Sequence, residues 1–489
     1  MKACQREPVS YLAQHGGDAF EVSKQTGLPS NKILDFSLNS NPYGPPKEVF
    51  TAIRSVSHEI KFYPSRSYTE LREAIASYLN AFEGYRLASK NAEGRPRLNR
   101  DNIVLGCGST ELIHSFLARF VRGGSVIVPL PTFSEYEAAA TAHGIKSLKI
   151  NPKGIAVDIE GVKANIESGN ADCVIICNPN NPTGELFNSR TMLELLETAS
   201  SKGIYLMVDE AYLDLSSASI LESLLPIVED YENLIVLRSL TKPFGFPGMR
   251  AGYAVASNKL ARAFESTAIS WRVGALESRA VLAAVGVKGF LEKSRDKILN
   301  ERPRLFNRLN KFEGFKVESS DANFALVEIS GTGFSPSNLK WRLLSHGVLV
   351  RELGGMQGLE GNYIRVCVRS KKENATLVRA MKNVLSSASK IDSIAVQNEC
   401  TFRPCHFEGQ DCRICFCPFY PCLDGLTGGK FVKSEKGGSI WSCIDCLWIH
   451  KSKPAAKIIA ELEASHLSLL KSEPCEILKI RKRVLEDSA

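Results

Sequence analysis

A lysine flanked by potential phosphate-binding residues stands in the segment Ser239–Arg250. Hydroxyl side chains precede Lys242 by three residues, at Ser239, and by one, at Thr241, and Arg250 follows eight residues later. A lysine amine can form a Schiff base with an aldehyde cofactor, whose phosphate the hydroxyls and the guanidinium can hold. An isolated strand-end lysine is usually a solvated surface residue. The chemistry therefore depends on whether other motifs supply the rest of a cofactor site.

Two further segments supply groups for such a cofactor. Gly108, Ser109 and Thr110 precede the helical run Glu111–Phe120, and free backbone N–H groups at a helix N-terminus bind anions. Asp209 directly follows the apolar run Ile204–Val208. A carboxylate there can keep a pyridine ring nitrogen protonated, which makes the ring an electron sink. Either segment alone would be an ordinary turn or helix cap.

Three more side chains complete a candidate ring site. Asn181 lies in the rigid turn Asn-Pro-Asn-Asn-Pro-Thr-Gly at 178–184, and Tyr212 follows Asp209 by three residues. Both side chains can contact a phenolic oxygen on the ring of such a cofactor. Phe133, after Pro131 and Thr132, can stack on the ring face, although an aromatic residue at such a position is usually part of the core.

These motifs stand directly after short apolar runs that are typical of strands buried on both faces. The runs are Asn102–Leu105, Ser125–Val128, Cys173–Cys177, Ile204–Val208 and Leu234–Leu237. Segments of helical composition separate most of them, which predicts an α/β fold with a mainly parallel sheet. Ligands of such sheets bind beyond the carboxyl ends of the strands, so the motifs predict one composite site.

The composition is that of an ordinary soluble protein. The 489 residues are 44% hydrophobic and 23% charged, with a net charge of +8. The longest uncharged apolar run, Ala280–Val287, is too short to span a membrane. The polar segment Met1–Pro8 lacks a signal-peptide core, so we expect a cytoplasmic protein with no membrane partner. The mildly basic charge fits an enzyme for anionic small molecules as well as a nucleic-acid binder.

Taken together, the motifs resemble those of the fold-type I pyridoxal-phosphate enzymes, over residues 10–385. The chain is similar to the histidinol-phosphate aminotransferase branch and, more closely, to the threonine-phosphate decarboxylases of cobalamin biosynthesis. The closer resemblance rests on the segments His15–Asp18, Asp35–Asn39, Pro131–Tyr136 and Tyr363–Ser370. It implies pyridoxal 5′-phosphate as cofactor and L-threonine O-3-phosphate as substrate, decarboxylated to 1-amino-2-propanol O-2-phosphate.

The resemblance also implies a role for each candidate residue. Lys242 would carry the cofactor, and Asp209 would pair with the ring nitrogen of the cofactor. Asn181 and Tyr212 would contact its 3′-oxygen. Phe133 would stack on the ring. Its phosphate would be held by Gly108, Ser109, Thr110, Ser239, Thr241 and Arg250, with Tyr63 reaching the partner subunit's phosphate in a homodimer. His15, Arg351 and Arg365 would bind the two anionic groups of the substrate, and the division between carboxylate and phosphate stays open.

The same resemblance implies an aminotransferase-like region over residues 1–390. Its large domain would span about 65–275, and a small α/β domain would form from 1–64 and 276–390. A Cys-rich metal-ribbon-like domain and a helical tail would follow at 399–489.

The cysteines of the tail have the spacing of metal ligands. Nine of the 14 cysteines lie in the last 90 residues. Two Cys-x2-Cys pairs, Cys412/Cys415 and Cys443/Cys446, can complete a tetrahedral zinc site. The neighbouring Cys405, Cys417 and Cys422 leave room for a second site or an iron–sulfur cluster. Zinc is the expected metal, with a structural role.

The tail resembles a small Cys-rich domain joined to some cobamide-pathway decarboxylases, and phosphorylation of threonine is one hypothesis for its role. It contains no Gly-x4-Gly-Lys-Ser/Thr loop. Since no cofactor motif contains a required cysteine, we expect a chain that ends near Ser389 to fold and act without the tail.

Two other functions remain compatible with these residues. The first is a histidinol-phosphate aminotransferase with the same fold. The second is a regulator with a catalytically silent pyridoxal fold and a zinc module for nucleic acid. The full set of cofactor residues and the lack of a helix-turn-helix segment argue against the regulator and against a nucleic-acid partner.

Overall fold

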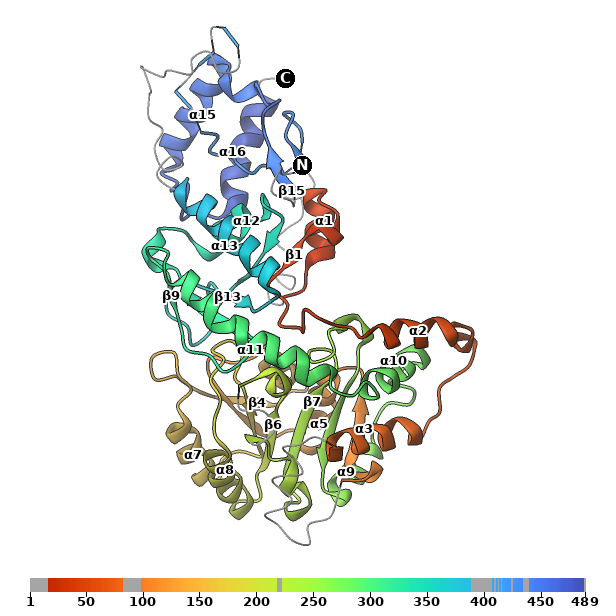
Figure 1. The fold of residues 1–489 in the computed structure, drawn as a ribbon. Helices are drawn as coiled ribbons and strands as arrows, with labels where there is room; N and C mark the ends of the chain where they lie inside the picture. The colour runs from red at the N-terminus through yellow and green to blue at the C-terminus, as the bar shows by residue number, and fades with distance from the viewer. Residues whose placement is uncertain are drawn as a thin grey trace.

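A seven-stranded sheet forms the centre of the large domain (Figure 1). The computed structural model describes residues 16–81, 98–217, 222–387, 407–408, 410–411, 413–414, 416–423, 425–433 and 439–487. The strand order is β2-β8-β7-β6-β5-β3-β4, in which β3 to β7 run parallel and β8 runs antiparallel to both of its neighbours. The strands are β2 (Ile103–Gly106), β3 (Ser125–Pro129), β4 (Lys146–Ile150), β5 (Cys173–Cys177), β6 (Tyr205–Asp209), β7 (Leu234–Ser239) and β8 (Gly252–Ala256).

Helices cover both faces of this sheet, which explains why its central strands are apolar throughout. One face packs against α5 (Ser109–Phe120), α6 (Glu135–Ala142) and α9 (Asn258–Glu265). The other packs against α3 (Thr69–Ala81), α7 (Ile159–Glu167), α8 (Ser189–Ser201) and α10 (Ala275–Val285). The expected mainly parallel α/β sheet is confirmed, with strand bounds within two residues of the predicted ones.

The small domain contains a four-stranded antiparallel sheet of order β12-β13-β10-β9. Its strands are β9 (Lys316–Val317), β10 (Phe324–Glu328), β12 (Arg351–Glu352) and β13 (Tyr363–Cys367). A separate parallel pair joins β1 (Leu34–Asp35) to β11 (Val348–Leu349). The helices of the small domain are α1 (Ala19–Thr26), α12 (Pro336–Leu344) and α13 (Lys371–Ser386). The helix α2 (Lys47–Ser55) packs on α10. The long helix α11 (Phe290–Leu309) runs between the two domains (Figure 1).

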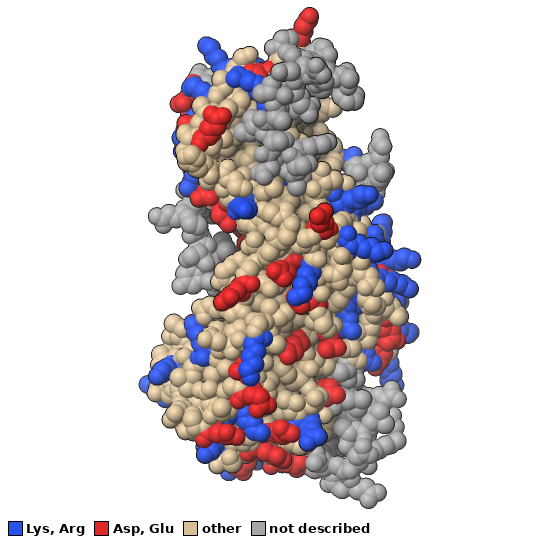
Figure 2. All heavy atoms as spheres, turned by 90° about the vertical axis from the view of Figure 1, so that its left-hand side faces the viewer, with Lys and Arg blue, Asp and Glu red and all other residues tan. Residues whose placement is uncertain are grey.

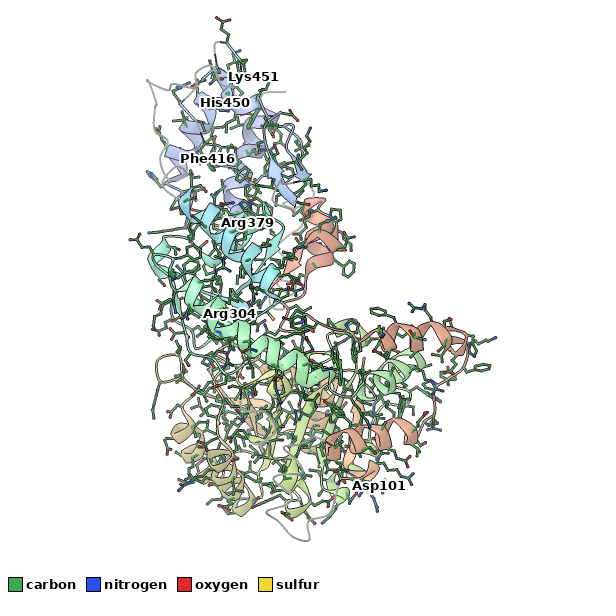
Figure 3. All side chains as sticks on the ribbon, in the orientation of Figure 1. Asp101, Arg304, Arg379, Phe416, His450 and Lys451 are labelled. Atoms are coloured by element: carbon green, nitrogen blue, oxygen red, sulfur yellow. The ribbon has the colours of Figure 1, made fainter. Side chains whose placement is uncertain are left out.

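The Cys-rich tail lies on the small domain, beside α12 and α13 (Figure 1). It contains the hairpin β14 (Lys430–Lys433) and β15 (Ser439–Ser442) and the helices α15 (Ser452–Ser465) and α16 (Pro474–Glu486). Arg379 of α13 and Phe416 of the tail lie in neighbouring parts of the molecule (Figure 3). Leu339 and Leu343 of α12 belong to the same buried core as Phe419 and Leu469 of the tail.

This continuous core argues against the expectation that the chain folds and acts without the tail. A chain that ended near Ser389 would expose the apolar face of α12, which a helix buries for stability. The two parts are therefore separate in sequence but joined in packing.

The surface carries ordinary mixed charge. Over the lower part of the face in Figure 2, acidic and basic side chains are interspersed, and that part offers no continuous basic track for a phosphate backbone. Among the described residues, no helix is long and apolar enough to cross a membrane.

Candidate active site

The predicted site residues meet at the carboxyl edge of the large sheet. Asp209 ends β6, Asn181 follows β5, and Lys242 follows β7. The parallel register places Cys177, the last residue of β5, beside Asp209, and Asp209 beside Leu237 of β7. The strand ends are therefore level, and the three loops begin at one edge.

Lys242 lies in an environment that favours its neutral amine. Burial, together with the positive charges of Arg365 and Arg250, lowers its pKa to about 8, whereas the Asp209 carboxylate acts in the opposite direction. A neutral amine is the form that attacks an aldehyde. The lowered pKa of Lys242 suits the Schiff-base role that its sequence context predicts, and that role stays a prediction.

Asp209 accepts two hydrogen bonds. The phenol of Tyr136, on α6, donates to Oδ2 at 2.8 Å, and the backbone N–H of Ala211 donates to Oδ1 at 3.0 Å. Burial raises the pKa of Asp209, and these two hydrogen bonds counteract that rise. Sequence reasoning gave no role to Tyr136: it stands in the Pro131–Tyr136 segment, but only the fold brings it to Asp209.

A candidate phosphate cradle, made of hydrogen-bond donors, lies at the start of α5. Gly108 has a φ of +84°, and a Cβ there would lie 2.7 Å from Nη2 of Arg250. The guanidinium thus lies against the glycine that precedes the helix N-terminus at Ser109. Ser239, at the end of β7, and Thr241 hydrogen-bond to each other through their hydroxyls at 2.8 Å. These donors fit a bound phosphate.

Asn181, Tyr212 and Arg365 form a connected group. Asn181 Nδ2 donates to the Tyr212 phenol at 3.4 Å, and Arg365 Nη1 donates to Asn181 Oδ1. Arg365 Nη2 also donates to the carbonyl of Ser37 at 3.0 Å. Burial raises the pKa of Tyr212, while the charge of Arg365 lowers it. The structure therefore joins a residue predicted for substrate to two predicted for the cofactor ring.

The two predicted substrate arginines are cross-strand neighbours. Arg351 of β12 is directly opposite Arg365 of β13. Burial and the positive charge of Arg365 together lower the pKa of Arg351 to about 10. Asp18 raises the same pKa, which places the Gly16–Asp18 segment nearby. His15, predicted beside this segment, lies outside the described residues.

Asn39 is a second residue to which sequence reasoning gave no role. Its side chain is 2% exposed and lies beside the Tyr212 phenol. In the described part of the chain, neither its amide nitrogen nor its amide oxygen has a hydrogen-bond partner of good geometry. The nearby Tyr212 phenol takes up part of this hydrogen-bonding capacity, since a hydrogen bond from Asn39 lowers the pKa of the phenol. A ligand can satisfy the rest of the amide.

The two predicted aromatic contacts lie at different places. Phe133 is half-buried, with its ring edge-to-face on Tyr136 at 5.6 Å between centroids. Tyr63 is 79% exposed and stacks against Trp271 at 4.5 Å. The structure thus brings Phe133 next to the Asp209 partner, while the roles of both rings toward the cofactor stay predictions.

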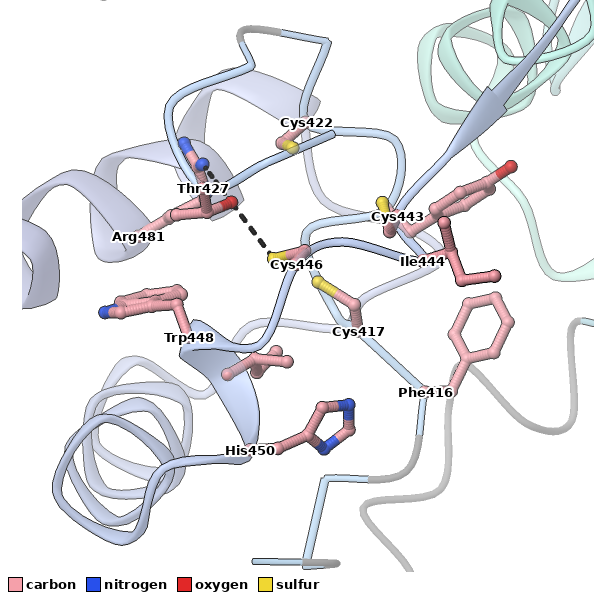
Figure 4. A pocket seen from close by; sticks show the side chains of 12 residues that line it. Phe416, Cys417, Cys422, Thr427, Cys443, Ile444, Cys446, Trp448, His450 and Arg481 are labelled. Atoms are coloured by element: carbon pink, nitrogen blue, oxygen red, sulfur yellow. Dashed lines mark hydrogen bonds between the residues drawn. The ribbon is translucent and has the colours of Figure 1, made fainter. Parts of the chain in front are cut away.

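Four tail cysteines line a cavity of about 250 Å³ (Figure 4). They are Cys417, Cys422, Cys443 and Cys446, and four thiols around one space are a donor set for a tetrahedral metal. Burial raises the pKa of Cys417 to about 12. As placed, no three acidic, histidine or cysteine side chains in the described part of the tail lie close enough to share one ion. Cys405, Cys412 and Cys415 lie outside the described residues.

The sequence matches two family models. Residues 31–381 match "Aminotransferase class I and II", and residues 392–473 match "Cysteine-rich small domain". The chain belongs to the aminotransferase class I and II family. Within that family, the lysine, the Asp209 carboxylate and the phosphate cradle fit pyridoxal phosphate as cofactor, and the Cys-rich domain is consistent with metal binding.

Relatives within the aminotransferase family carry two kinds of name. Histidinol-phosphate aminotransferase 2 of Archaeoglobus fulgidus is 32% identical over 73% of this chain and 94% of its own length. A Caldanaerobacter subterraneus protein named "Putative threonine-phosphate decarboxylase" is 29% identical over 76% and 94%. The crystal structure of the histidinol-phosphate aminotransferase from Clostridium acetobutylicum is 27% identical, with a TM-score of 0.64, and covers 73% of this chain and all of its own.

Proposed function

We propose that this enzyme decarboxylates L-threonine O-3-phosphate to (R)-1-amino-2-propanol O-2-phosphate and carbon dioxide, in cobalamin biosynthesis. The observation that carries the proposal is the pairing of Arg351 with Arg365 across β12 and β13, beside the Lys242 site. A buried guanidinium group, that of Arg365, and a half-buried one, that of Arg351, suit a small substrate with two anionic groups. L-Threonine O-3-phosphate has both a carboxylate and a phosphate.

The side chains of the site divide the work in this proposal. Pyridoxal phosphate, when bound, supplies the electron sink for bond cleavage at the substrate Cα. Asp209, held by Tyr136, keeps a proton on the ring nitrogen of the cofactor. Arg351 and Arg365 orient the two anionic groups. The protonated Lys242, made a stronger acid by its lowered pKa, gives a proton to Cα after carbon dioxide leaves and becomes the neutral amine.

Histidinol-phosphate transamination is the second candidate, and the names of several relatives favour it. The discriminating experiment incubates the holoenzyme with L-threonine O-3-phosphate alone, and separately with histidinol phosphate and 2-oxoglutarate. Carbon dioxide release in the first reaction supports the proposal. Glutamate formation in the second, with no carbon dioxide in the first, replaces it by the aminotransferase. No turnover in either reaction, with the cofactor bound, favours the silent regulator.

We also propose a homodimer in which Tyr63 completes the site of the partner subunit. Apolar side chains gather on the surface around Tyr63, including Ile60, Phe62 and Ile269, which are all more than 60% exposed. An exposed group of this kind marks an interaction surface. Mixing inactive Lys242→Ala and Tyr63→Ala variants should restore activity, because one site of the mixed dimer has both residues intact. A monomer in sedimentation analysis would contradict this proposal.

For the tail, we propose one zinc ion held by cysteine thiolates that include those lining the cavity. Their side chains must close around the ion, because as placed no three of the described ones can share it. Elemental analysis should find about one zinc per chain, and Cys443→Ser should lower that content without loss of the bound cofactor. A brown protein that contains iron and sulfide would instead assign the iron–sulfur alternative.

A further inference from the structure

Hydrogen bonds join the Cys-rich tail to α12, the helix that comes before β12 in the chain. The strand β12 carries Arg351, which is predicted to bind substrate. Ser335, the N-cap of α12, donates its backbone N–H to the carbonyl of Leu470 at 3.0 Å. Asn338 Nδ2 donates to the carbonyls of Leu469 and Ser472 at 3.1 and 3.0 Å. The first half of α12 is therefore fixed by the backbone of the segment between α15 and α16.

The second half of α12 is fixed through two larger side chains. Arg342 is 4% exposed, and its guanidinium donates to the carbonyls of Tyr420 at 2.7 Å and Leu469 at 3.0 Å. Trp341 Nε1 donates to the carbonyl of Pro421 at 2.8 Å. Burial of a guanidinium is tolerated because its donors are directed at fixed carbonyls. Arg342 thus joins two separate tail segments to one helix.

From α12, the connection to the substrate strand is short. Lys340 pairs with Glu352 at 3.1 Å, and both side chains are largely buried. Glu352 is the neighbour of Arg351 in β12, whose partner in the sheet is Arg365. The ring of Pro336, at the start of α12, also packs against Gly354, just after β12.

A second connection runs through the β1–β11 pair. Trp441 of the tail donates its backbone N–H to the carbonyl of Ser345, just before β11. The strand β11 pairs with β1, which leads directly into Ser37. The carbonyl of Ser37 accepts a hydrogen bond from Arg365. Arg351 and Arg365, the two arginines predicted to bind substrate, therefore both contact backbone segments that α12 and the tail fix.

We propose that the Cys-rich tail positions the substrate site. In this proposal Arg342 is the positioning residue: its hydrogen bonds to the tail fix α12, and α12 in turn fixes the strand that carries Arg351. The inference rests on the proposed role of Arg351 in binding an anionic substrate. A displacement of about 1 Å at a binding group can cost a large factor in efficiency, so loss of the Arg342 contacts should weaken substrate binding at a distance. The cofactor residues lie on the large sheet and should be unaffected.

The test compares Arg342→Met with Arg483→Met in the full-length holoenzyme. Arg483 also lies in the tail but forms its exposed ion pair with Glu461 of α15 and not with a residue of α12. Trp341→Phe removes a single hydrogen-bond donor to the tail, so it tests the same connection if Arg342→Met does not fold. Hydrogen exchange is measured on peptides that cover Val348–Glu352, together with KM for whichever of L-threonine O-3-phosphate and histidinol phosphate the wild type turns over.

Arg342→Met should raise KM by about tenfold or more and speed amide exchange in Val348–Glu352, with the cofactor dissociation constant within about twofold of wild type. Trp341→Phe should act in the same direction, Arg342→Lys should restore part of the effect, and Arg483→Met should do neither. Faster exchange confined to tail peptides, with an unchanged KM, would overturn the proposal. If the wild type turns over neither substrate, the proposed function fails, while the exchange measurement still decides the positioning role.

Discussion

The phenol of Tyr136 donates a hydrogen bond of 2.8 Å to Oδ2 of Asp209, and both side chains are buried. This contact holds the carboxylate on the side of the sheet where the Lys242 loop begins. It also lowers the pKa of a carboxyl group that burial alone would raise. The proposed pairing with a protonated ring nitrogen needs an ionised Asp209, so we expect that role to depend on a tyrosine from α6.

Tyr136→Phe should weaken cofactor binding by about 10- to 100-fold, because a hydrogen bond to a charged group contributes about 1.5–3 kcal/mol. The measurement is the dissociation constant of pyridoxal phosphate from the apoenzyme, followed by visible absorption. Tyr205→Phe is the matched control, since that ring packs on Phe116 in the apolar core. Equal affinities for the wild type and Tyr136→Phe would show that the contact does not support Asp209.

The rate at which the apoenzyme takes up pyridoxal phosphate should rise with pH through about 8, the pKa of Lys242. The sign follows from the chemistry: the protonated amine predominates below that pH and cannot attack, and the neutral amine predominates above it. Arg365→Met removes a positive neighbour, so the midpoint should move to higher pH. Lys242→Ala should abolish covalent attachment, and retained covalent cofactor in that variant would falsify the assignment.

Arg365→Ala should lower kcat/KM by more than about thirtyfold, since loss of one partner of a buried, charge-assisted pair costs about 2–5 kcal/mol. Steady-state kinetics with L-threonine O-3-phosphate test this. Because Arg365 also donates to Asn181, we expect a small shift in cofactor absorption but no loss of the cofactor. Arg304→Ala, on the exposed part of α11 (Figure 3), serves as the control.

Arg238→Met should destabilise the large domain by about 3–5 kcal/mol, because it leaves buried carboxylates without their counter-charge. Arg238 pairs with Glu210 at 3.0 Å and Asp214 at 2.7 Å, and all three side chains are buried. The measurement is urea unfolding of the variant against Lys259→Met. Lys259 forms an exposed pair with Glu232, and such pairs contribute little. Similar midpoints for the two variants would contradict the prediction.

The sequence alone determined the chemistry of the cofactor site. Lys242, Asp209 and Asn181 follow apolar strands, and the carboxyl ends of parallel strands meet at one edge. That is a local pattern repeated along the chain, so it can be read without coordinates. The same holds for Gly108, whose left-handed φ suits glycine at the start of an anion-binding helix.

Only the tertiary structure decided which distant side chains join that site. Tyr136 reaches Asp209 from another helix, Arg351 faces Arg365 through strand register, and Arg342 anchors the tail to α12. These contacts join residues separated by 14 to 78 positions. Helical or strand periodicity describes neighbours within one element, whereas packing between elements depends on how whole surfaces fit. The tail therefore looks independent in the sequence, and the folded chain buries its contact with the small domain.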